Sequence, residues 1–176
     1  LQGEDYWTQV RARFPLTKNR VYMNNGTFGP APFPVQKALI ESLQEVNTSG
    51  EYGITDPERE KLAGFLGIKT SEISLTHNTT EGINIMAWGV SLKSGDEVIL
   101  TNHDHVGNAL PWLNLAKLHG IVLKPFTPAS NFEENLDLIK SLVTPKTKVI
   151  AIPHVTCTTG LVFPIKEISE FARSKG

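Results

Sequence analysis

The residues best suited to chemistry are a run of hydroxyl and amide side chains at the start of an expected helix. Thr79, Thr80 and Glu81 follow a strand expected at Ile73–Thr76. The first turn of a helix leaves several backbone N–H groups unpaired, and the helix dipole makes that end positive. Such a turn, with two hydroxyl groups added, can hold a phosphate group without a glycine-rich loop. Asn78 or Thr79 could equally serve as an ordinary helix cap.

A second candidate group, His103-Asp104-His105, comes soon after a strand expected at Glu97–Thr101. Open α/β sheets place their ligands at the carboxyl ends of strands. An imidazole there could stack on an aromatic cofactor or bind a metal ion. The His-x-His spacing suits metal binding, but no cluster of carboxylates or cysteines accompanies it. We therefore predict no metal site, and we keep a His-x-His metal-dependent hydrolase as an alternative.

A third group of small polar residues, which includes Thr156 and Cys157, ends a strand expected at Val149–Val155. Turn formation explains these residues equally well. Cys157 has no identifiable base beside it, so we interpret it as a small residue that lines a site, not as a nucleophile. It is the only cysteine, and an internal disulfide is therefore excluded.

A fourth group, Asn24, Asn25 and Gly26, belongs to a loop that ends at Pro30. Asparagine and glycine favour left-handed turn positions, which leave backbone amides exposed to a ligand. The loop does not match the dinucleotide-binding fingerprint, because no Gly-x-Gly-x-x-Gly stands between a strand and a helix.

The elements that must position these groups alternate between short β-branched runs and longer segments of helical period. From residue 71 this pattern predicts parallel strands joined by crossover helices. The strands are nearly continuous in apolar residues, which is typical of strands covered on both faces. We expect an α/β fold for residues 71–176, with three layers (αβα) around a mostly parallel sheet. Its expected strands are Ile73–Thr76, Glu97–Thr101, Ile121–Phe126 and Val149–Val155, and its helices are Thr79–Val90, Val106–His119, Asn135–Val143 and Pro164 to Gly176.

Residues 1–70 are expected to form an N-terminal arm and helices that pack on the main domain. Prolines interrupt regular structure before a helix from Val35 to about Val46. A second helix begins at Asp56, which we expect to cap it, and ends at Gly67. The first helix carries an apolar stripe that should be buried, formed by Val35, Leu39, Leu43 and Val46.

Composition argues against partners that are polyanions. Of the 176 residues 40% are hydrophobic, and 17 basic residues stand against 18 acidic ones, for a net charge of −1. Such a chain can bury a core but has no basic field to attract nucleic acid or an anionic membrane. The apolar runs are strand-sized and the first residues do not resemble a leader peptide. We expect a cytoplasmic protein with no nucleic-acid and no membrane partner.

Taken together and in this order, the four groups resemble the class V aminotransferases, which are pyridoxal-phosphate enzymes of fold type I and include cysteine desulfurases, selenocysteine lyases and isopenicillin N epimerase-like proteins. The similarity covers the chain from about Tyr6. Its matching stretches are Tyr22-Met-Asn-Asn-Gly-Thr-Phe-Gly-Pro30, Asn78-Thr-Thr-Glu-Gly-Ile-Asn84, Asp104-His105 with Asn108 and Pro111-Trp112, and His154-Val155-Thr156 to Gly160 with Pro164-Ile165.

The resemblance implies pyridoxal phosphate as cofactor and an incomplete major domain of the pyridoxal-phosphate-dependent transferase type. Thr79, Thr80 and Glu81 would hold the cofactor phosphate, and His105 would lie over the ring. Thr156 and Cys157 would line the ring, although many desulfurases have asparagine where this chain has Cys157. Asn24, Asn25 and Gly26 would approach an amino-acid substrate, and the full-length protein would be a homodimer.

The same resemblance implies that these 176 residues lack the Schiff-base lysine. None of the twelve lysines stands in the family's Ser-x-His-Lys context. We therefore expect no catalytic residue in this chain, which would be inactive alone, as the N-terminal portion of a desulfurase or lyase, an epimerase or an aminotransferase. The sequence Thr-Cys-Thr-Thr-Gly slightly favours the epimerase-like or lyase-like subclass. A non-catalytic subunit that needs a partner chain is the alternative.

Overall fold

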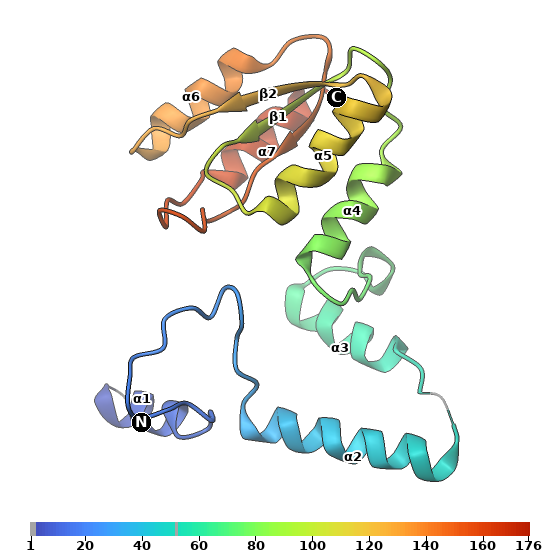
Figure 1. Ribbon diagram of the computed structural model, residues 1–176, viewed down its shortest axis with the longest axis vertical. Helices are drawn as coiled ribbons and strands as arrows, with labels where there is room; N and C mark the ends of the chain where they lie inside the picture. The colour runs from blue at the N-terminus through green and yellow to red at the C-terminus, as the bar shows by residue number, and fades with distance from the viewer. Residues whose placement is uncertain (1–2, 52) are drawn as a thin grey trace. The chain divides into compact units, whose positions relative to one another are not determined.

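The computed structural model describes residues 3–51 and 53–176 (Figure 1). The chain divides into two compact units, of which the second runs from Leu75 to Gly176 and the first comprises the residues before it. Among the described residues, no helix is both long enough and apolar enough to cross a membrane.

The second unit is built on a parallel sheet of three strands. They are β1 (Glu97–Thr101), β2 (Val122–Phe126) and β3 (Thr147–Ala151), in the order β2-β1-β3. Because β1 lies in the middle, four of its five residues are buried. The strands have parallel neighbours, so their carboxyl ends lie at one edge of the sheet.

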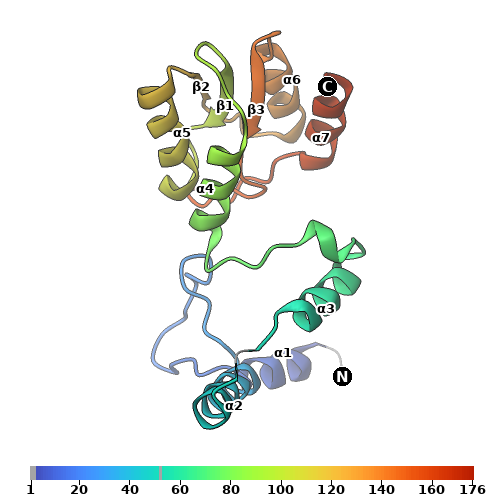
Figure 2. The same ribbon diagram turned by 90° about the vertical axis from the view of Figure 1, so that its right-hand side faces the viewer.

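Helices cover both faces of this sheet (Figure 2). Consecutive residues of β1 point to opposite faces. Val98 packs with residues of α4 (Thr79–Gly89) and α5 (Val106–His119), whereas Ile99 packs with residues of α6 (Phe132–Leu142) and α7 (Ile165–Ser174). Two hydrophobic cores therefore lie on opposite sides of one sheet. The predicted α/β architecture, a parallel sheet flanked by helices, is confirmed.

Several element boundaries differ from the sequence prediction for local reasons. The prediction of a strand at Ile73–Thr76 is wrong. That segment pairs with no strand in the described part of the chain, and Ile73 O instead accepts a hydrogen bond from Arg59 Nε at 3.1 Å. The strand expected to reach Val155 ends at Ala151, because Pro153 has no N–H to donate to a ladder. Helix α6 begins three residues before the predicted start, since Asn131 accepts a hydrogen bond from Glu134 N and caps it.

The first unit contains helices α1 (Glu4–Arg11), α2 (Phe33–Ser49) and α3 (Asp56–Leu66) and the short 3-10 helix η1 (Thr70–Glu72). Helix α1 was not predicted, although two acidic residues in its first turn and a basic residue in its last suit the helix dipole. Asp56 is the first residue of α3, which Thr55 precedes, so the expected cap was off by one residue. Each of α2 and α3 is followed directly by a glycine C-cap with a φ of 69°.

The stripe expected to be buried on α2 is exposed. The exposed fractions of its four residues run from 40% to 70%: Val35, Leu39, Leu43 and Val46. An apolar stripe is buried only where another element covers it, and no residue of α2 is buried in the described part of the chain. The helix was predicted correctly and its burial was not.

A partly buried ion pair joins β1 to β2, and a hydrogen bond from Thr147 links it to β3. Lys124 Nζ lies 3.4 Å from Glu97 Oε2, and these side chains are 22% and 14% exposed. The same carboxylate oxygen accepts hydrogen bonds from Thr144 Oγ1 at 2.7 Å and Thr147 Oγ1 at 3.1 Å. The hydrogen bond from Thr144 contributes most to lowering the pKa of Glu97 below its ordinary value of 4.5. The hydrogen bond from Thr147 and the positive charge of Lys124 lower it further. The carboxylate is therefore held in its charged form.

Replacing Glu97 with glutamine should lower the melting temperature at pH 7 and flatten its acid dependence. Because the folded-state pKa is lowered, this carboxylate contributes stability above its ordinary pKa of 4.5 and loses the contribution as the pH falls through the lower value. Melting curves followed by circular dichroism from pH 7 to pH 3 test this. Glu170→Gln, on the exposed side of α7, is the matched control. Equal acid slopes for Glu97→Gln and wild type would contradict the prediction.

Candidate functional site

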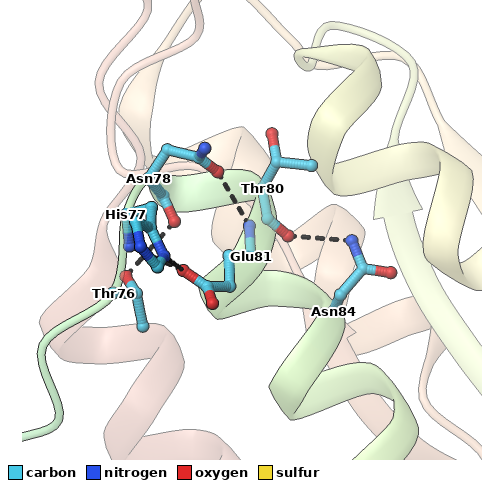
Figure 3. Close-up of polar contacts among 6 residues, drawn as sticks. All are labelled: Thr76, His77, Asn78, Thr80, Glu81 and Asn84. Carbon is cyan, nitrogen blue, oxygen red and sulfur yellow. Dashed lines mark hydrogen bonds and ion pairs between the residues drawn. The ribbon is translucent and has the colours of Figure 1, made fainter.

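The site begins at the first turn of α4, where Asn78 is the N-cap. Its extended backbone stops the helix, and its Oδ1 accepts a hydrogen bond from Glu81 N at 2.9 Å. Asn78 O accepts from Gly82 N at 3.2 Å. Figure 3 shows the side-chain oxygen of Asn78 turned back onto this turn. The cap alternative raised by the sequence is thus realised by Asn78, which leaves Thr79 free of that task.

Two of the three residues expected at the phosphate turn keep free donors. The amide of Glu81 is already bound to Asn78. Neither Thr79 N nor Thr80 N donates a hydrogen bond within the described residues, and both residues are exposed. These N–H groups lie at the positive end of the α4 dipole. They form, with the two threonine hydroxyls, an arrangement that can bind an anion.

The carboxylate of Glu81 is held away from those donors. Its Oε2 accepts from His77 N at 2.6 Å and lies 2.9 Å from His77 Nδ1. The hydrogen bond from the His77 backbone, and then the one from its side chain, lower the pKa of Glu81 below 4.5. In Figure 3 the carboxylate faces His77, whereas the Thr80 hydroxyl points away from it. The negative charge is therefore engaged on the His77 side of the turn.

Helix α5 begins beside this turn, and its N-cap is His105. The imidazole Nδ1 accepts a hydrogen bond from Gly107 N at 2.9 Å. In a neutral ring the proton must then reside on Nε2. The residue as a whole is exposed. His105 thus combines a capping role with a fixed ring orientation.

Gly107 brings the two first turns together. A Cβ added at this position would lie 2.5 Å from Thr80 Oγ1 and 2.9 Å from His105 Nδ1. A side chain at this position would have to displace the Thr80 hydroxyl or the His105 ring. The structure therefore places Thr80 and His105 on either side of Gly107. Sequence reasoning missed this glycine, although a glycine in the first turn of a helix was a signal that could have been used.

The loop that contains Thr156 and Cys157 is closed by its own hydrogen bonds. Thr156 is buried, its hydroxyl lies 2.7 Å from that of Thr159, and its Oγ1 accepts from Leu161 N at 2.9 Å. An antiparallel bridge between Val155 and Val162 completes the loop. Cys157 is exposed. Across the described residues, no hydrogen bond joins this loop to the first turns of α4 or α5.

The loop that carries Asn24, Asn25 and Gly26 belongs to the first unit. Tyr22 OH donates to Phe28 O at 2.6 Å and to Asn24 O at 3.2 Å. Phe28 N also donates to Asn24 O, at 3.2 Å. The loop is thereby closed on itself with its amides exposed, and its expected contact with a substrate stays a prediction.

The metal alternative gains no geometric support from the residues that the structure describes. Within residues 3–51 and 53–176, no group of three or more His, Cys, Asp or Glu side chains is placed to hold a metal ion. Nδ1 of His105 is moreover committed to Gly107 N.

Comparison with protein families gives a match to Aminotransferase class-V over residues 41–176, most of the chain. The chain belongs to this family. A probable cysteine desulfurase of Methanothermobacter thermautotrophicus is 32% identical over 177 residues, which are 95% of this chain and 44% of that protein. The isopenicillin N epimerase of Amycolatopsis lactamdurans is 26% identical over 97% of this chain and 46% of its own length.

Solved structures give the same result. A mutant of C-DES with glycine covalently linked to its PLP cofactor superposes with a TM-score of 0.82 at 26% identity, over 93% of this chain and 46% of that one. This class-V chain therefore spans under half the length of the relatives it matches.

Substituting Gly107 with alanine should destabilise the second unit by about 1–3 kcal/mol, because the new methyl group must displace the Thr80 hydroxyl or the His105 ring. Gly82→Ala in α4 is the matched control. Its added Cβ meets only Thr76 Oγ1, at an ordinary 3.8 Å, and should stabilise the helix by about 0.5–1 kcal/mol. Denaturant unfolding measures both changes. If Gly107→Ala proved as stable as wild type, the close approach of the two turns would be wrong.

Proposed function

We propose that this chain forms the cofactor-binding part of a pyridoxal-phosphate-dependent enzyme that acts on an amino acid. The observation that carries the proposal is the pair of unpaired N–H groups at Thr79 and Thr80, next to the ring of His105 across Gly107. Desulfuration or another lyase reaction, epimerisation and transamination are the reactions that the relatives' names suggest.

The phosphate of the cofactor fits the first turn of α4. A dianionic phosphate needs several donors and no negative charge pointing at it. Thr79 and Thr80 supply two N–H groups and two hydroxyls, and Glu81 is turned to His77. The geometry therefore suits a phosphate, and we assign its binding to Thr79 and Thr80, with Glu81 shaping the turn.

The pyridine ring fits the open face of His105. When bound, pyridoxal phosphate supplies the electron sink for bond cleavage at the Cα of an amino acid. In our proposal the role of His105 is to cover and orient that ring, for which its exposed, pre-oriented imidazole is suited. Of the two loop residues expected near the ring, Thr156 has its hydroxyl engaged within the loop, so exposed Cys157 is the one available for a contact.

Catalysis itself requires more than these residues supply. No lysine of the chain stands in a Ser-x-His-Lys context, so we propose that these 176 residues alone bind the cofactor without a covalent bond and are inactive. In the whole protein, Asn24, Asn25 and Gly26 would approach the amino-acid substrate, and the assembly would be a homodimer.

A second candidate function, a subunit completed by a partner chain, is supported by a groove along β3. Among the described residues, this strand has a sheet neighbour on one side only. The groove has a volume of about 740 Å³, and its lining includes Ile150 of β3, Ile168 and Phe171 of α7 and the terminal Gly176. An unpaired strand edge flanked by apolar side chains is a template for another strand. Sedimentation of the isolated chain would favour this candidate if it showed association without the cofactor.

The isolated chain should bind pyridoxal phosphate, and two substitutions should weaken binding. Thr80→Val keeps the side-chain shape but removes a hydroxyl that we place on a charged phosphate. Loss of one such bond corresponds to about 1.5–3 kcal/mol, or about tenfold or more in the dissociation constant. His105→Ala should weaken binding and also change the absorbance of the bound cofactor. Titration followed by absorbance measures both effects.

His119→Ala is the control for these variants, because His119 is the last residue of α5 and lies at the other end of the helix from His105. Inorganic phosphate should compete with the cofactor in wild type and less effectively in Thr80→Val. Absence of any absorbance change in wild type, or equal binding by the control and by both site variants, would remove the basis of the proposal.

A further inference from the structure

A chain of side-chain hydrogen bonds runs from the core to the segment that carries His105. It starts at Trp112, which is 3% exposed and packs in the core with Ala87 and Val98. Trp112 Nε1 donates to Asn108 Oδ1 at 3.3 Å, and Asn108 Nδ2 donates to Asp104 Oδ2 at 2.6 Å. An indole N–H can only donate and a carboxylate can only accept. The Asn108 amide therefore satisfies both neighbours in one orientation alone.

Asn108 holds the backbone of His105 at both of its polar groups. Its own N–H donates to His105 O at 2.9 Å. Through Asp104 it also holds the other group, because Asp104 Oδ1 accepts from His105 N at 2.6 Å. The ring is then fixed by the bond from Gly107 N to its Nδ1. Since His105 is exposed, packing does not fix it, and these bonds supply its order.

We propose that Asn108 is a positioning residue that holds the backbone of His105, so that Gly107 N can fix the plane and the tautomer of its imidazole in advance of binding. Its value to the site rests on the proposed function, in which an aromatic pyridine ring lies on that imidazole. A ring oriented beforehand avoids the entropy cost of ordering an exposed side chain when the ligand arrives. Asn108 would thus act on the ligand only through Asp104 and His105.

An exchange of the two side chains gives a sharp test. Asn108→Asp puts one carboxylate against another, so it breaks the link to Asp104. The double variant Asp104→Asn with Asn108→Asp restores every bond in the chain. The new amide at position 104 donates to the new carboxylate at position 108 and accepts from His105 N, and that carboxylate accepts from Trp112 Nε1. A rescue by the double variant cannot arise from bulk or from charge count, because it has the composition of wild type.

The first readout is the tautomer of His105, measured by ¹⁵N NMR of the imidazole in the full chain without cofactor. We expect the Nε2–H tautomer in wild type, a mixture in Asn108→Asp, and recovery in the double variant. Trp112→Phe is the second variant, for use if Asn108→Asp does not fold. It keeps an aromatic ring in the core but removes the N–H donor to Asn108, and it should give a partial mixture of tautomers at His105. An unchanged tautomer in Asn108→Asp or Trp112→Phe, or no recovery in the double variant, overturns the inference.

The second readout is the dissociation constant of pyridoxal phosphate, which separates this inference from the proposed function. Asn108→Asp should weaken binding about fivefold to tenfold, as expected for the loss of about one hydrogen bond, and the double variant should return to near the wild-type value. If wild type binds no cofactor while the tautomer changes and recovers as described, the proposed function fails and the positioning role of Asn108 is supported. If wild type binds and the tautomer never changes, the proposed function stands and the positioning role is refuted.

Discussion

The hydrogen bond from Glu81 N to Asn78 Oδ1 is the interaction on which the account of the site depends. It fixes the residue at which α4 begins, and thereby decides which amides remain unpaired. With Asn78 as cap, the free donors are those of Thr79 and Thr80. A start one residue later would move the free donors along the chain and would rotate the threonine hydroxyls relative to α5.

The sheet and one glycine convert that helix end into a site with two sides. Strand β1 brings the chain to the carboxyl edge of the sheet, and four residues, which include Asp104 and His105, separate its end from the start of α5. The missing side chain of Gly107 then allows Thr80 and His105 to approach the same backbone atom. The first turn of α4 and the ring of His105 thereby meet at Gly107, close to the carboxyl end of β1.

Sequence reasoning located the elements best where local signals are strong. Strand β1 and helix α5 have the predicted limits, because a continuous apolar run and a clear helical period define them. Ile73–Thr76 has the composition of a strand but pairs with no strand in the described part of the chain, and pairing is a tertiary property that composition does not reveal. The prediction that the apolar stripe of α2 is buried failed for a related reason. Helical period indicates which face of a helix is apolar, but not whether another element covers that face.

The candidate site was predictable in kind but not in detail. The positions of Thr79, Thr80 and His105 followed from motifs at helix starts, whereas three features depended on distances. These are the engagement of Glu81 with His77, the contact at Gly107, and the bonds that lead from Trp112 to Asp104. Each involves a hydrogen bond or a steric contact whose geometry sequence spacing leaves open.

The most direct test of the central claim is a ¹H–¹⁵N NMR titration of the labelled chain with pyridoxal phosphate. We expect the largest amide shifts at Thr79 and Thr80, because a phosphate would become their acceptor, with further shifts at His105 and Gly107. Shifts that leave Thr79 and Thr80 unmoved, or that gather on another surface of the chain, would contradict it.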